Sequence, residues 1–133
     1  MLRFFAIIAA VASFMFGAFS LAASDSREGW VDYSAQGFAK AQQSGDAIVV
    51  DVYATWCPTC RAQEPILDEL REDKRLSNVT FVKVNFDKDK DFLRAHRIPR
   101  QSTILVFKGE KEVARSIAET DRTRLRKLVF DAI

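Results

Sequence analysis

Two cysteines separated by two residues, Cys57 and Cys60, are the residues of this chain whose types and spacing most clearly suggest chemistry. They are its only cysteines, and they follow a strongly apolar stretch. A structural zinc ion needs four ligands, which usually come from two pairs of cysteine or histidine residues. The chain offers no second pair, because His96 is its only histidine. The sequence therefore disfavours a structural zinc site.

A purely structural disulfide is the second interpretation of the pair. It would close a loop of four residues, which stabilises a fold by only about 2 kcal/mol, less than a long loop does. Redox chemistry is the third interpretation, because a thiolate at the N-terminus of a helix is stabilised by backbone N–H groups and by the helix dipole. A neighbouring cysteine then resolves the mixed disulfide. A predicted strand before the pair and a predicted helix after it favour this redox interpretation.

Asp51 is the one charged residue in the apolar stretch 47–53. This stretch is rich in β-branched residues and is typical of a central strand that is covered on both faces. A carboxylate inside such a strand is costly unless it is paired with a cation or stays protonated. The alternative is an aspartate that faces solvent at the edge of the sheet. The presence of Asp51 therefore requires a specific explanation.

Hydrophobic periodicity predicts the elements that must position these residues. Helices are expected over residues 34–43, 57–73, 87–95 and 121–132, and strands over residues 47–53, 79–85, 103–108 and 111–117. In the second helix Ile66, Leu67 and Leu70 form the apolar face, and Gln63 is among the residues predicted to point outward. This order of elements predicts an α/β fold in which helices flank a mixed central sheet.

The length and composition of the chain are those of one ordinary domain. It has 133 residues, of which 48% are hydrophobic and 29% charged, enough to bury a core. The net charge is only +2, and basic and acidic residues are interleaved, so we expect no nucleic-acid binding. Residues 24–46 are predicted to hold a linker and the first helix, and residues 47–133 the domain itself.

Residues 1–23 have the pattern of a secretory signal peptide. Arg3 precedes an apolar run over residues 4–19, and small residues follow at Ser20, Ala22 and Ala23. An uncleaved N-terminal membrane anchor is the alternative, because the apolar run is close to the lower length limit for a bilayer span. Either arrangement places the domain outside the cytoplasm, in the periplasm or an equivalent compartment. A cysteine pair is oxidised there unless electrons are supplied.

The sequence around the cysteines resembles the thioredoxin family. The likeness rests on the order and spacing of five residues, Asp51, Trp56, Cys57, Cys60 and Pro65. It extends over about residues 47 to 133. The run Trp56-Cys57-Pro58-Thr59-Cys60 is similar to that of the membrane-tethered thiol reductases of cytochrome c maturation.

This resemblance implies a thioredoxin fold and a dithiol–disulfide exchange that needs no cofactor and no metal. By the resemblance, Cys57 attacks or is attacked, and Cys60 resolves the mixed disulfide. Asp51 matches a buried acid that relays a proton to and from the resolving thiol. Lys83 matches the lysine that faces this acid in the family, and a solvated strand residue is the alternative for it.

One position departs from the family, whose cis-proline precedes the strand that follows the third helix and faces the cysteines. Counting back from the predicted strand at Thr103, this position is Ser102, whereas Pro99 lies three residues too early. A cis bond before a non-proline residue is costly, so we expect the bond before Ser102 to be trans or strained. Ser102 would place a hydroxyl near Cys57, and with Trp56 and Pro58 it would contact substrate.

These observations predict a monomeric reductase of extracytoplasmic protein disulfides. Pro58 lacks an N–H group that could stabilise the Cys57 thiolate, and a less stable thiolate makes a weaker oxidant. By resemblance, its reductant is a membrane thiol-electron transporter, and its substrates are disulfide-containing proteins. A copper(I)-binding module is one alternative, although Met1 and Met15, the soft ligands that it would need, lie in the leader. A redox-inactive interaction domain is the other, although neither cysteine nor the acid has been lost.

Overall fold

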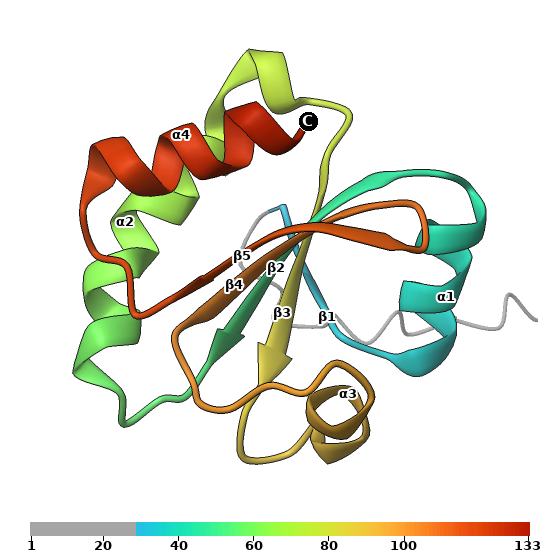
Figure 1. Cartoon of the computed structure of the whole chain (residues 1–133), viewed down its shortest axis with the longest axis horizontal. Helices are drawn as coiled ribbons and strands as arrows, with labels where there is room; N and C mark the ends of the chain where they lie inside the picture. The colour runs from blue at the N-terminus through green and yellow to red at the C-terminus, as the bar shows by residue number, and fades with distance from the viewer. Residues whose placement is uncertain (1–28) are drawn as a thin grey trace, which may run out of the picture.

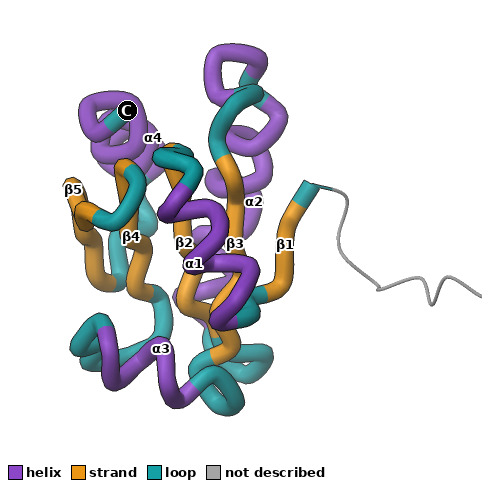
Figure 2. The backbone as a smooth tube through the Cα atoms, turned by 90° about the vertical axis from the view of Figure 1, so that its right-hand side faces the viewer, coloured by secondary structure: helices purple, strands orange, loops and turns teal. Residues whose placement is uncertain are grey.

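Five strands form one mixed sheet in the order β1-β3-β2-β4-β5, and Figure 2 shows them side by side, with α1 and α3 in front of them. The computed structural model describes residues 29–133; the predicted leader lies outside them. The strands are β1 (Trp30–Asp32), β2 (Ala47–Tyr53), β3 (Thr80–Asn85), β4 (Thr103–Lys108) and β5 (Lys111–Ile117). The helices are α1 (Ala35–Gln43), α2 (Pro58–Glu72), α3 (Lys90–Ala95) and α4 (Arg122–Ala132), with a 3-10 turn at Lys74–Leu76. The predicted α/β fold with a mixed sheet is confirmed.

Strand β2 lies at the centre and pairs parallel with β3 and antiparallel with β4. Because side chains alternate along a strand, Ile48, Val50 and Val52 enter the core on one face of the sheet, and Val49 enters the core on the other. Asp51 lies two positions after Val49 and therefore on the same face of β2. Its carboxylate points toward the layer that contains α2. This register places the one buried acid of β2 beneath the helix that carries the cysteines.

The sheet begins earlier in the chain than predicted. Strand β1 pairs parallel with β3, with Trp30 opposite Phe81, so the domain boundary expected at residue 47 needs correction to about residue 30. The indole of Trp30 is buried and packs edge-on against the Phe81 ring, with 5.4 Å between ring centroids. A strand of three residues is too short to show an alternating pattern, which is why the sequence did not reveal it.

Helices α2 and α4 cover one face of the sheet, while α1 and α3 lie on the other (Figure 1). The core between the sheet and the first pair is built from aliphatic side chains that include Leu67, Leu70, Leu125 and Val129. On the opposite face, the aromatic side chains of Phe38, Phe92 and Phe107, from α1, α3 and β4, pack in the core together with aliphatic residues. Among residues 29–133, no helix combines the length and the hydrophobicity needed to cross a bilayer.

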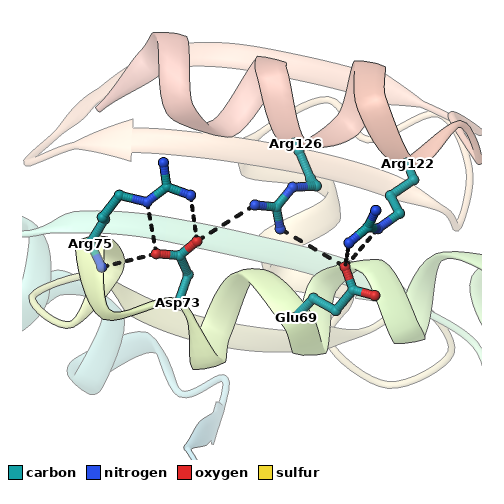
Figure 3. Close-up of polar contacts among 5 residues, drawn as sticks. All are labelled: Glu69, Asp73, Arg75, Arg122 and Arg126. Carbon is teal, nitrogen blue, oxygen red and sulfur yellow. Dashed lines mark hydrogen bonds and ion pairs between the residues drawn. The ribbon is translucent and has the colours of Figure 1, made fainter.

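Ion pairs join α4 to the end of α2 and to the turn that follows it (Figure 3). Arg126 reaches Glu69 at 3.9 Å and Asp73 at 3.5 Å, Arg122 contacts Glu69 at 2.7 Å, and Arg75 contacts Asp73 at 2.7 Å. Most of these groups are partly exposed, and such pairs contribute little individually. We therefore attribute the position of α2 mainly to its apolar contacts.

Candidate active site

Cys57 is the N-cap residue of α2 and follows directly on the turn after β2. Its backbone is extended, and its sulfur accepts a hydrogen bond from the backbone N–H of Cys60, with 3.1 Å between nitrogen and sulfur. Pro58 begins the helix, a position that proline tolerates because its missing N–H has no partner within the helix there. The sulfur of Cys57 therefore lies at the positive end of the helix dipole, where a thiolate is favoured.

The two thiols are free and have different acidities. Burial raises the pKa of Cys57, but hydrogen bonds from Cys60, Ser102 and Gln101 lower it by more, so the net shift is below the ordinary value. Burial raises the pKa of Cys60, and its hydrogen bond to Cys57 and the charge of Cys57 raise it further. Cys57 therefore deprotonates first, as a nucleophile must, and Cys60 keeps its proton.

Asp51 and Lys83 form a buried ion pair beneath the cysteines. The Nζ atom of Lys83 lies 2.8 Å from Oδ2 of Asp51, and the two residues are only 8% and 2% exposed. They are register partners on the parallel strands β3 and β2. Lys83 also lies 4.6 Å from the ring centroid of Trp30 and 5.0 Å from that of Tyr53. Neither residue is exposed at the surface, so the alternative interpretations of both are wrong.

A cavity of about 260 Å³ connects the buried acid with the resolving thiol. Asp51, Lys83 and Cys60 line it, together with Arg61 and Thr55, both of which are exposed at the surface. A cavity of this size and polarity has room for several water molecules. Asp51 and Cys60 therefore line one polar space that also reaches residues at the surface.

Ser102 lies beside both sulfur atoms. Its Oγ atom is 3.1 Å from Cys57 Sγ and 3.2 Å from Cys60 Sγ, and the residue is fully buried. No cis peptide bond occurs within residues 29–133, and Ser102 has a φ of 65° in the left-handed region. Pro99 is exposed. These contacts put Ser102 at the position expected from counting back along the chain, with a trans but strained backbone.

Gln63 was predicted to point outward, and that prediction is wrong. The residue is fully buried, and its Nε2 atom donates to the carbonyl oxygens of Ser102, at 3.3 Å, and Glu119, at 2.9 Å. Gln63 therefore ties the segment that carries Ser102 to the loop before α4. The helical spacing indicated this burial, because Gln63 precedes Ile66 by three residues and Leu67 by four and so lies on the apolar face of the helix.

Trp56 and Pro58 form the exposed surface next to Cys57. The Trp56 side of this surface is fixed by a hydrogen bond from the indole Nε1 to Oδ2 of Asp87, at 2.9 Å, although the residue is 55% exposed. Sequence reasoning did not single out Asp87. Its position after β3 could have revealed it, because the carboxyl ends of the parallel strands β2 and β3 meet at the same edge of the sheet.

Comparison with known proteins agrees with this geometry. The profile of the Thioredoxin family matches residues 31–131. An H-type thioredoxin of Fagopyrum esculentum is 33% identical over 95 residues, which cover 71% of this chain and 80% of that protein. A thioredoxin of Chlamydia trachomatis serovar D is 32% identical over 96 residues, covering 72% and 91% of the two chains. The solved structure of Trxlp from Edwardsiella tarda EIB202 has a TM-score of 0.73 at 39% identity, covering 75% and 97%.

The five-stranded sheet with its flanking helices, and the cysteine pair at the start of α2, define a thioredoxin fold with a dithiol site. The chain belongs to the thioredoxin family. Its activity is the exchange of dithiols and disulfides through the pair Cys57 and Cys60. The mechanism requires a thiolate at one sulfur, a second thiol within reach, and a group that receives the second proton. Cys57, Cys60 and Asp51 are placed for these three requirements.

Proposed function

We propose that this oxidoreductase works as a reductase of disulfides in extracytoplasmic proteins. The observation that carries the proposal is the burial of both cysteines, which are 1% and 7% exposed. Burial disfavours a thiolate, and at Cys57 it opposes the hydrogen bonds that stabilise the charge. Burial therefore limits the stabilisation of the thiolate, and a less stabilised thiolate leaves the dithiol a better electron donor.

Pro58 does not weaken the Cys57 thiolate in the way that the sequence predicted. An N-cap side chain accepts hydrogen bonds from the N–H groups of the second and third helical residues. In this site the donor to Cys57 is Cys60, the third residue, while Pro58 is the first. The missing N–H of Pro58 therefore removes a donor that the cap does not use. The direction of electron flow rests instead on the burial of the sulfurs.

The proposed location follows from residues 1–23, which have a basic residue, an apolar run and small residues in the order of a signal peptide. A reductase in an oxidising compartment needs a supply of electrons. The similarity of the Trp56–Cys60 run to the thiol reductases of cytochrome c maturation supports a membrane thiol-electron transporter as the source. The substrates would be disulfide-containing proteins, met by the monomer at the surface around Trp56.

The test of direction is the redox equilibrium of the purified protein against a series of glutathione buffers. We expect a reduction potential below about −250 mV, in the range of reductases. A potential near about −120 mV, the range of strong oxidants, would overturn the proposal. Location is tested separately by cell fractionation. Recovery after osmotic release or in the membrane fraction supports an extracytoplasmic domain, and recovery with the cytosol refutes it.

A further inference from the structure

The hydroxyl of Ser102 lies between two sulfur atoms and has only one proton to donate. Its Oγ atom is 3.1 Å from Cys57 Sγ and 3.2 Å from Cys60 Sγ, both within the range of hydrogen bonds to sulfur. A serine hydroxyl donates one hydrogen bond at a time and rotates freely about its C–O bond. Ser102 and both cysteines are buried, so bulk water competes little for this proton. The hydroxyl therefore has a choice of two acceptors at nearly equal distance.

The backbone around Ser102 holds the hydroxyl in this position. The N–H of Ser102 donates to the carbonyl of Val52 at 2.8 Å, and its carbonyl accepts from the N–H of Ala118 at 2.9 Å. Gln63 donates to the same carbonyl from α2. Ser102 keeps a φ of 65° among these contacts, a conformation that persists for a non-glycine residue only where its surroundings enforce it. Strand β2, helix α2 and the residue after β5 thus hold the backbone of Ser102 beside both sulfurs.

We propose that Ser102 is a catalytic residue that donates its hydrogen bond to Cys57 in the first half of the exchange and to Cys60 in the second half. In each half it stabilises the sulfur that carries the negative charge. A hydrogen bond to an ionised acceptor is roughly twice as strong as one to a neutral acceptor, so the hydroxyl follows the charge. The inference rests on the exchange chemistry and not on the direction of electron flow.

In the first half, the thiolate of Cys57 attacks one sulfur of a substrate disulfide. A bond forms between Cys57 Sγ and that sulfur, the substrate S–S bond breaks, and the second substrate sulfur leaves with the electron pair as a thiolate. Cys57 has now lost its charge and is a weak acceptor. The Ser102 hydroxyl is released and turns to Cys60.

In the second half, Cys60 loses its proton into the cavity that it shares with Asp51. The Ser102 hydroxyl stabilises the new thiolate, which attacks Cys57 Sγ. A bond forms between the two cysteine sulfurs, the mixed disulfide breaks, and the remaining substrate sulfur leaves with the electron pair. The substrate disulfide has been reduced by two electrons, and the cysteine pair has been oxidised by two.

The two halves can be followed in one stopped-flow experiment with 5,5′-dithiobis(2-nitrobenzoate) in excess over the reduced full chain. Attack by Cys57 releases one coloured thiolate, and resolution by Cys60 releases a second. The test variant is Ser102→Ala, which removes the hydroxyl and keeps the Cβ atom. Ser102→Gly removes the hydroxyl and also relieves the left-handed backbone. Thr103→Val is the matched control, because the Thr103 hydroxyl lies in the same segment but donates to the carbonyl of Arg100 at 2.7 Å.

At neutral pH we expect Ser102→Ala and Ser102→Gly each to slow both phases about threefold. Raising a thiol pKa by one unit lowers the thiolate fraction about tenfold, but the remaining thiolate is about threefold more nucleophilic. Thr103→Val should leave both rates unchanged. At a pH above the pKa of both thiols, the rate difference between the Ser102 variants and the wild type should vanish or reverse. A thiolate of higher pKa is the stronger nucleophile. The proposal is overturned if Ser102→Ala slows only the first phase or neither, or if Ser102→Gly reacts at the wild-type rate at neutral pH.

Discussion

Two chemically identical thiols, three positions apart, acquire different roles from their surroundings. Cys57 caps a helix, and hydrogen bonds to its sulfur overcome the cost of burial and lower its pKa. Cys60 lies inside the first turn, where burial and the neighbouring Cys57 raise its pKa. Two-step exchange needs one cysteine that is ionised and attacks, and a second that stays protonated until a base removes its proton. The asymmetry therefore comes from position in the helix.

Asp51→Asn is expected to slow resolution by Cys60 at neutral pH, because an amide does not accept the proton of the thiol. The variant also leaves the ammonium of Lys83 buried without its carboxylate, and breaking such a pair costs about 3 to 5 kcal/mol of unfolding free energy. Denaturant unfolding measures the stability, and the second phase of the thiolate-release assay measures resolution.

The double variant Asp51→Asn/Lys83→Met separates these two effects. It removes both charges, so we expect it to regain most of the lost stability while resolution remains slow. Wild-type resolution in either variant would contradict the role of Asp51 as proton acceptor.

Much of the site could be predicted at the level of single residues, for identifiable reasons. A charged residue in an apolar strand marked Asp51, and paired spacing marked Cys57 and Cys60. Gln63 was missed because its polar type was given more weight than its helical spacing. Asp87 was missed because its contact with Trp56 joins segments 31 positions apart, which only the pairing of the parallel strands β2 and β3 brings together.

At the scale of elements, α2 both presents the cysteines and holds the segment opposite them. Its apolar face packs on the sheet, and Gln63 extends this face with two hydrogen bonds to backbone carbonyls. Strands β4 and β5 pair as an antiparallel hairpin, and the side chains of Ser34 and Asp121 cap α1 and α4. Strand β1 escaped prediction because pairing with β3, and not its own sequence, makes it a strand.

Gln63→Leu is expected to destabilise the fold by about 1 kcal/mol, the lower end of the cost of leaving a backbone acceptor without a donor, because that acceptor is partly buried. The carbonyl of Ser102 keeps its bond from Ala118, so the loss falls on the carbonyl of Glu119. Gln43→Leu makes the same chemical change at an exposed position of α1 and should alter the unfolding free energy by less than about 0.5 kcal/mol. Equal stability of the two variants in denaturant would show that Gln63 holds nothing in place.

At the scale of the whole molecule, the face of the sheet away from the cysteines carries an aromatic core that includes the only histidine. The His96 ring lies 4.3 Å from that of Phe92, 5.3 Å from that of Phe107 and 5.7 Å from that of Phe38, measured between centroids. Burial lowers the pKa of His96, and Glu112 and Arg115 on β5 act on it in opposite directions. This core therefore stabilises the neutral imidazole.

The fold is expected to lose stability as the pH falls from about 6.5, the pKa of a histidine in an unfolded chain. Because the pKa of His96 is lower in the folded state, the unfolded chain binds the proton first, and the unfolding free energy declines until the folded pKa is reached. His96→Phe should reduce this dependence of the unfolding free energy on pH, which denaturant titrations at several pH values measure. The pKa of Glu119 is also lowered from its ordinary value of 4.5, so Glu119 does not contribute to the start of the decline near pH 6.5. A slope unchanged by His96→Phe would refute the assignment.

The division of labour between the two cysteines is the central claim, and site-resolved alkylation tests it most directly. The reduced protein is treated with iodoacetamide over a range of pH, and the rate at each cysteine is measured by peptide mass spectrometry. We predict that Cys57 reacts first and titrates below about 8.5, the value of a free cysteine, while Cys60 stays unreactive until higher pH. Equal rates at the two cysteines across the range, or faster reaction at Cys60, would contradict the mechanism.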